Sequence, residues 1–165
     1  MISALKRLAL TSTLIVLSVT AMQAQAQLSS STKPAQSAPT TLQPTPVFTD
    51  YKGIKIGLPA SDVRTNLEKY LKSKGDLQDV LVVSDNESAQ VFYDEKGKVR
   101  AVSIDYLTKN GNAPTPAQVL GKEIQPRADG SVYALERYPE LGYWISYNRT
   151  SGENPLVTIT MQSIR

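Results

Sequence analysis

Carboxylates are the first side chains to consider for chemistry in this chain, because its 165 residues include no histidine and no cysteine. Their absence excludes imidazole-based Ser and Cys triads and zinc sites ligated by His or Cys. Glu136 and Glu140 are four positions apart, and a carboxylate pair is what glycoside hydrolysis needs. However, Tyr138-Pro139 ends a predicted strand between them, so their spacing does not fix the distance between the two carboxyl groups.

The other acidic segments are typical of turns. Asp94 and Glu95 belong to a predicted hairpin turn that ends at Lys98, where acidic residues are common and solvated. Asp85-Asn86-Glu87 lacks the spacing of a calcium-binding EF-hand loop. No Gly-rich phosphate loop follows a predicted strand, and no local spacing defines a Ser–Lys nucleophile pair. We therefore expect a protein that is not an enzyme and has no cofactor or metal, with a carboxylate-pair hydrolase as the less favoured alternative.

The first 26 residues predict an exported protein. Lys6 and Arg7 precede an apolar run from Leu8 to Ala21, and Ala24-Gln25-Ala26 offers a small-x-small cleavage site. This order is that of a secretory signal peptide. The apolar run is shorter than the roughly 20 residues that span a bilayer, so cleavage is favoured over retention as a membrane anchor. We expect a periplasmic or secreted location.

The overall charge argues against a nucleic-acid partner. The chain has 18 basic and 15 acidic residues, and a cleaved signal peptide takes Lys6 and Arg7 with it. The remaining basic residues are dispersed among acids, for example Lys69 and Lys72 near Glu68. Nucleic-acid binding needs a clustered basic surface instead.

One folded domain is expected after a linker. Residues 27–46 consist largely of Ser, Thr, Gln and Pro, and such a stretch buries too little apolar surface to offset its ordering entropy. The domain is predicted over residues 47–165, long enough for a single core. Without cysteine, that core must stabilise the fold without disulfides.

The pattern within the domain predicts an α+β fold. Val63, Leu67, Tyr70 and Leu71 form an apolar stripe at helical spacing after Pro59. A short second helix is expected between a Thr115 cap and Gly121. Alternating segments predict six strands, over Val80–Ser84, Ala89–Tyr93, Val99–Leu107, Ser131–Tyr138, Tyr143–Asn148 and Leu156–Gln162.

Matched positions suggest an internal repeat. Tyr93-Asp94 and Tyr147-Asn148 are 54 positions apart, and Ala101-Val-Ser-Ile and Leu156-Val-Thr-Ile are 55 apart. We predict two tandem αβββ units, over about 47–108 and 109–165, that form a curved antiparallel sheet with helices on one face. An unrelated pair of hairpins is the alternative.

The run Ile54-Lys-Ile-Gly-Leu-Pro-Ala-Ser-Asp-Val-Arg64 resembles the opening of small outer-membrane assembly lipoproteins. The tandem αβββ plan resembles secreted β-lactamase inhibitor proteins, which bind other proteins through the open, concave face of their sheet. The resemblance implies this fold and a protein-binding function. The lipoprotein cysteine is absent, and Pro59 stands where that family has a Ser or Thr cap.

Strand alternation separates a core face from an open face. Val102, Ile104 and Tyr106, with Val157, Ile159 and Met161, are assigned to the core. The opposite parity gives the candidate binding residues, namely Trp144 and Phe92 as apolar anchors with Ser103, Asp105, Thr158 and Thr160 around them. Aromatic anchors among small polar residues are typical of protein interfaces. A register slip of one residue would invert this assignment, and a loop could cover Trp144.

The favoured function is therefore an exported, non-catalytic module that binds another envelope or secreted protein. A module that binds cell-wall glycan with the same aromatic residues is the alternative, because Tyr133, Tyr138, Tyr143 and Tyr147 accompany Trp144 in the last third of the chain.

Overall fold

A computed structural model describes residues 45–108 and 113–164, which lie within one compact unit, Thr40–Arg165. The predicted signal peptide, most of the predicted linker and residues 109–112 lie outside the described residues. Among the described residues, no helix is long and apolar enough to cross a membrane.

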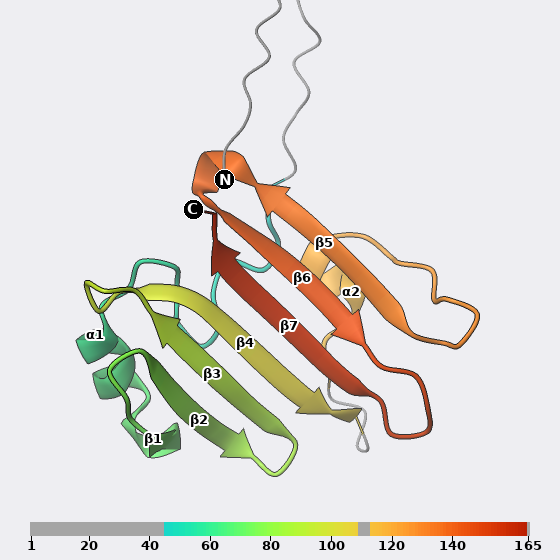
Figure 1. Cartoon of the computed structure of the whole chain (residues 1–165). Helices are drawn as coiled ribbons and strands as arrows, with labels where there is room; N and C mark the ends of the chain where they lie inside the picture. Colours follow the sequence, from blue (N-terminus) through green and yellow to red (C-terminus); the bar gives the residue numbers. More distant parts are fainter. Residues whose placement is uncertain (1–44, 109–112, 165) are drawn as a thin grey trace, which may run out of the picture. The chain divides into compact units, whose positions relative to one another are not determined.

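The described part of the unit is dominated by one antiparallel sheet of seven strands in the order β1-β2-β3-β4-β7-β6-β5 (Figure 1). The strands are β1 (Leu71–Ser73), β2 (Gln78–Ser84), β3 (Glu87–Tyr93), β4 (Val99–Leu107), β5 (Val132–Tyr138), β6 (Tyr143–Arg149) and β7 (Leu156–Ser163). The helices are α1 (Ala60–Asn66) and α2 (Pro116–Leu120), with short 3-10 turns over Glu68–Tyr70 and Pro139–Leu141. The sheet-rich α+β class predicted from the sequence is confirmed.

All six predicted strands are present, within a few residues of their expected bounds, but the helical stripe is shorter than predicted. α1 ends at Asn66, and the chain becomes extended at Leu71, which pairs with Leu81 of β2. Tyr70 and Leu71 continue the helical spacing of Val63 and Leu67, yet they reach the core through a 3-10 turn and an edge strand. Pairing along the sheet edge therefore overrides helical periodicity at this point.

The turn after β3 forms as the sequence predicts. Asp94 N–H donates to the Lys98 carbonyl over 2.8 Å, and the Asp94 carboxylate accepts the Lys96 and Lys98 N–H groups at 2.9 and 2.8 Å. Gly97 has a positive φ of 68°, which a glycine adopts without strain. These backbone bonds hold the pKa of Asp94 below its usual value. Asp94 is therefore a turn residue.

The core lies between one face of the sheet and the two helices. Val63 and Leu67 from the α1 region and Val119 and Leu120 from α2 pack in one cluster with the inward residues of the strands. α2 packs mainly against β6 and lies behind the sheet in Figure 1. The inward strand residues include Leu81, Ala89, Val91, Tyr93, Val102, Ile104, Ile145, Tyr147, Val157, Ile159 and Met161. The predicted core parity is therefore confirmed.

The second helix depends on its cap. Thr115 accepts the Gln118 N–H at its hydroxyl over 3.3 Å, while the Gln118 side chain accepts the Thr115 N–H over 2.9 Å. Gly121 ends the helix in a left-handed conformation with φ 73°, and Pro116 supplies the fixed φ of the first turn. Five residues are too few for a helix to be stable alone, so capping and core packing hold it.

We expect Thr115→Ala to lower the free energy of unfolding by about 1 kcal/mol, because the Gln118 N–H loses its acceptor. Thr115→Ser keeps the hydroxyl and should stay close to the wild type. Urea denaturation of both variants measures this difference. Equal stabilities for the two variants would show that the cap contributes nothing.

Candidate functional site

The outward side of the sheet carries all six residues that the sequence singled out. We call this side the open face, because in the part of the chain that the structure describes the helices pack on the other side. Phe92, Trp144, Ser103, Asp105, Thr158 and Thr160 are all partly exposed here. Strand pairing is continuous from β3 through β4 and β7 to β6, so these side chains belong to one surface.

The four polar residues form two pairs across the central strands. Ser103 of β4 faces Thr160 of β7, and their hydroxyl oxygens are 3.2 Å apart. Two residues along the strands, on the same face, Thr158 donates its hydroxyl to Asp105 over 2.7 Å. The structure thus brings all four together, and each pair already satisfies part of its own hydrogen bonding. The hydroxyl and carboxylate oxygens still have acceptor sites for a partner's donors.

The two aromatic residues lie in one cross-strand row without touching along it. Phe92 pairs with Ala101, Ala101 with Gln162, and Gln162 with Trp144. Three steps between neighbouring strands separate the two aromatic positions by about 14 Å. Phe92 and Trp144 are therefore two separate anchors on either side of the central strands. Trp144 is partly buried, whereas the sequence led us to expect an exposed indole.

Three apolar residues on the open face were missed in the sequence-based site. Val82 of β2 is 44% exposed, Tyr133 of β5 is 49% exposed and Leu107 of β4 is 51% exposed. Strand alternation does assign Leu107 and Tyr133 to this parity, so the signal was present in the sequence. Their contribution to one apolar surface became visible only when the strand order placed their strands in the same sheet as Trp144.

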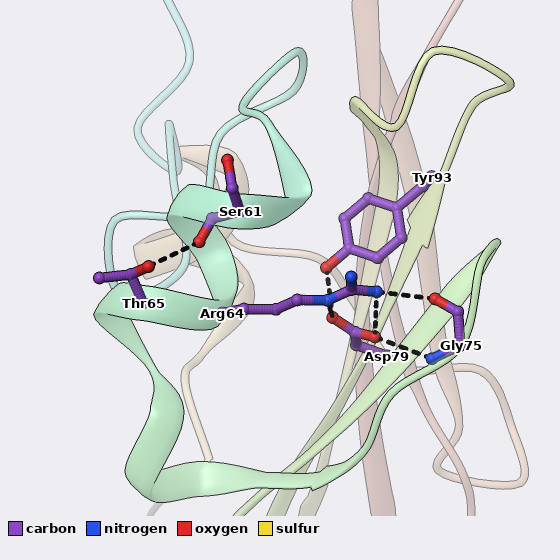
Figure 2. Close-up of polar contacts among 6 residues, drawn as sticks. All are labelled: Ser61, Arg64, Thr65, Gly75, Asp79 and Tyr93. Carbon is purple, nitrogen blue, oxygen red and sulfur yellow. Dashed lines mark hydrogen bonds and ion pairs between the residues drawn. The ribbon is translucent and has the colours of Figure 1, made fainter.

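A second constellation lies under the core side of the sheet, around Asp79 of β2 (Figure 2). Asp79 is fully buried, and each of its carboxylate oxygens accepts two hydrogen bonds. Oδ2 accepts from Arg64 Nε and from the Tyr93 hydroxyl, both at 2.8 Å. Oδ1 accepts from Arg64 Nη2 at 2.9 Å and from Gly75 N–H at 3.1 Å. We call these four residues the Asp79 cluster.

The Asp79 cluster ties four segments together. Arg64 comes from α1, Asp79 and Tyr93 come from β2 and β3, and Gly75 lies between β1 and β2. Arg64 also donates to the Gly75 carbonyl over 2.7 Å and lies over the Tyr93 ring. Arg64 ends the motif that carried the family resemblance, while Asp79 was missed because a lone acid at a strand's start resembles a turn residue. Its inward parity with Leu81 was the available signal.

Asp79 is charged in the folded protein. Burial alone would raise the pKa of its carboxyl group, but the bonds from Arg64, Tyr93 and Gly75 oppose that effect and leave the pKa below its ordinary value. Burial and the bond to Asp79 raise the pKa of the Tyr93 hydroxyl. Tyr93 is thus a proton donor to a carboxylate at neutral pH, an arrangement that favours a stable structural network.

The lowered pKa of Asp79 predicts acid sensitivity. Because protonation is harder in the folded than in the unfolded chain, the cluster stabilises the fold above the unfolded-state pKa of about 4. That stability should be lost as the pH falls through the folded-state pKa. We expect Asp79→Asn to be less stable than the wild type at pH 7, with the difference shrinking below pH about 4. Urea titrations across this range measure it, and a constant difference would contradict it.

Of the other carboxylates noted in the sequence, Glu87 and Glu136 have structural partners. Glu87 accepts the Tyr51 hydroxyl over 2.8 Å and lies 3.4 Å from the Lys52 ammonium. Glu136 pairs with Lys122. Glu140 lies in the 3-10 turn after β5 and is exposed. Among residues 45–108 and 113–164, no group of three or more acidic side chains converges as metal ligands would.

A hollow of about 640 Å³ lies at the end of the sheet where β3 turns into β4. Tyr93 and Leu77 contribute apolar walls, and Lys96, Lys98 and Arg100 contribute charge. Ser163, next to the Gln162 of the aromatic row, borders it. Tyr93 and Ser163 both have the parity of the core side of the sheet, so the hollow lies apart from the aromatic row of the open face.

Comparison with known proteins identifies no relative of this chain. No protein-family model matches the chain, and no curated protein or solved structure matches it. The function of the protein is therefore inferred from the geometry of the open face.

Proposed function

We propose that this protein is an exported, non-catalytic module of the cell envelope that binds another envelope or secreted protein through the open face. The observation that carries the proposal is the shared placement of Trp144, Phe92 and the two central polar pairs on one uninterrupted sheet surface. Large rigid aromatic side chains supply binding energy at protein interfaces, and surrounding polar groups supply specificity. The predicted signal peptide supports the location.

The polar groups fit a proteinaceous partner. Ser103, Thr160, Thr158 and Asp105 present neutral hydroxyls and one carboxylate, which can accept backbone N–H groups of an incoming chain. Val82 and Leu107 add exposed aliphatic surface to the same face. Aliphatic side chains suit burial against another protein better than stacking against a sugar ring, so the glycan-binding alternative takes second place.

The proposal includes a duplicated αβββ fold, in keeping with the resemblance to the inhibitor proteins and assembly lipoproteins. At an offset of 55 positions, Val102 of β4 corresponds to Val157 of β7, and Tyr106 corresponds to Met161. Val102 pairs with Met161 and Tyr106 pairs with Val157, on either side of a central Ile104–Ile159 pair. The two strands are therefore related by a local two-fold axis. The outer strands depart from it.

The departure is one of register. The observed pairing of Val91 with Val102 would, at offsets of 54 and 55, correspond to Ile145 with Val157. Ile145 pairs with Met161 instead. Duplication therefore fits the centre of the sheet and requires a later register shift in β6.

The test is capture from the native envelope fraction with the immobilised protein. We expect the wild type to retain one specific protein and Trp144→Ala to lose it. Val47→Ala is the matched control, because Val47 is exposed and apolar but precedes α1 and lies beside Gly121 after α2. Loss with Trp144→Ala and retention with Val47→Ala would support binding through the open face.

Three other outcomes would contradict the proposal. Equal capture by the wild type and Trp144→Ala would place the binding surface elsewhere on the molecule. Binding to purified cell-wall polysaccharide, with no protein retained, would replace the proposal with the glycan-binding alternative. Hydrolysis of wall material by the purified protein would support the carboxylate-pair hydrolase instead.

A further inference from the structure

The two edges of the sheet differ in how open they are to further pairing. β1 has three residues, and its pairing with β2 shifts register between Leu71 and Ser73. β5 has seven residues, all paired with β6 without a register shift. A short, irregular edge strand is protected against adding another strand, whereas a long regular edge strand is a template for one.

The outer side of β5 has no strand neighbour among the described residues. β5 ends the strand order of the sheet (Figure 1). Outside the β5–β6 ladder and the 3-10 turn that follows Tyr138, no hydrogen bond found among the described residues involves the backbone of Val132–Arg137. Backbone N–H and C=O groups at such an edge must bond to water or to another strand.

We propose that β5 pairs antiparallel with β5 of a second copy of this chain, centred on Leu135. In this register Leu135 faces Leu135 of the second copy, and Tyr133 faces the second copy's Arg137. Val132 faces the second copy's Tyr138 in the same way. The strand is therefore self-complementary, as a two-fold interface requires.

Charge selects this register over its neighbours. Centring the pair on Glu136 would place two carboxylates opposite each other, which is destabilising. Centring it on Ala134 would place Val132 opposite Glu136 and leave Arg137 beyond the facing strand. With Leu135 at the centre, the exposed Arg137 guanidinium meets the ring of Tyr133, which is 49% exposed, in a cation–π pair. Arg137 takes part in none of the ion pairs found among the described residues.

A two-fold axis perpendicular to the sheet keeps the open faces of both copies on the same side. Trp144 pairs with Arg137 in the β5–β6 register. The row that holds Phe92 and Trp144 would therefore continue across the seam to Tyr133 of the second copy. This inference does not depend on the proposed function, because self-association is measured without a partner protein.

The absence of native cysteine allows the register to be tested by single-cysteine cross-linking. The full chain is expressed with export, so that any N-terminal processing takes place, and is oxidised mildly. Leu135→Cys should form a reducible dimer about tenfold faster than Val82→Cys, because facing Cα atoms in a strand pair lie within disulfide range. Val82 is exposed on the same face but lies on β2, near the opposite edge.

The flanking positions check the centre of the pair. Tyr133→Cys and Arg137→Cys should cross-link when the two variants are mixed, because residue 133 of one copy faces residue 137 of the other. Neither variant should cross-link alone, because position 133 of one copy lies four residues along the strand, or about 13 Å, from position 133 of the other, and the same holds for position 137. Cross-linking of either one alone would overturn the Leu135-centred register. A Leu135→Cys rate equal to that of Val82→Cys would overturn the pairing itself.

Sedimentation without cross-linking gives an independent readout. The wild type should shift toward the dimer mass as its concentration rises. Leu135→Lys and Leu135→Glu should each stay monomeric, because like charges face each other at the axis, and an equal mixture of the two should dimerise. Restored association in the mixture also shows that both variants fold. A wild type that stays monomeric at every concentration, with no dimer in the mixture, would refute the proposal.

Discussion

Replacing Arg64 with leucine should lower the free energy of unfolding by about 3–5 kcal/mol, the largest stability loss expected from one surface-accessible position. The Arg64 side chain is 32% exposed, but the Asp79 carboxylate that it pairs with is completely buried. Removing the guanidinium takes two of the four hydrogen bonds from that carboxylate and its only charge partner in the cluster. Asp79 must then stay charged and under-bonded, or take up a proton at a free-energy cost.

The measurement is urea denaturation at pH 7, with Arg127→Leu as the matched control. Arg127 is exposed and forms none of the ion pairs found among the described residues, so its replacement should change stability by less than about 0.5 kcal/mol. Adding Asp79→Leu to Arg64→Leu should recover part of the loss, because the uncompensated charge disappears. A double variant that loses the sum of both single losses would show that the pair is not coupled.

Trp144→Ala should weaken binding of the captured partner by about 30-fold or more, equivalent to about 2 kcal/mol, as truncation of an interface hot spot does. The physical reason is that the indole presents a large rigid surface on the open face, outside the core cluster formed by the inward side chains. Because Trp144 is partly buried within the sheet surface, we expect only a modest loss of thermal stability. Calorimetric titration and a thermal melt of the same preparation separate the two effects.

Phe92→Ala supplies a second test of the same surface. Its position is three strand steps from Trp144 in the same row, so the two substitutions should reduce affinity additively. Strong non-additivity would mean that both act through one rearranged element. A large loss of thermal stability in Trp144→Ala, with affinity unchanged, would show that the indole supports the sheet and is no anchor.

The sequence alone determined the elements that depend on local chemistry. Helix α2 begins after the Thr115 cap with Pro116 and ends at Gly121, as predicted. Capping and a left-handed helix end are set by neighbouring residues in the sequence. The turn from Asp94 to Lys98 formed for the same reason. Alternation separated the core side from the open side of β4 and β7, because side chains of a strand point to opposite faces in turn.

Only the tertiary structure decided what the strand order brings together. Local patterns do not say which strand lies beside which, so the central β4–β7 pairing, the row shared by Phe92 and Trp144, and the free edge at β5 could not be read from periodicity. The same holds for Arg64 and Asp79, 15 positions apart, whose ion pair depends on α1 packing against β2 and β3. The strand order and the Arg64–Asp79 ion pair are stabilised by contacts between residues that are far apart in the sequence. Such contacts form only when folding closes the loops between them, so local sequence patterns do not reveal them.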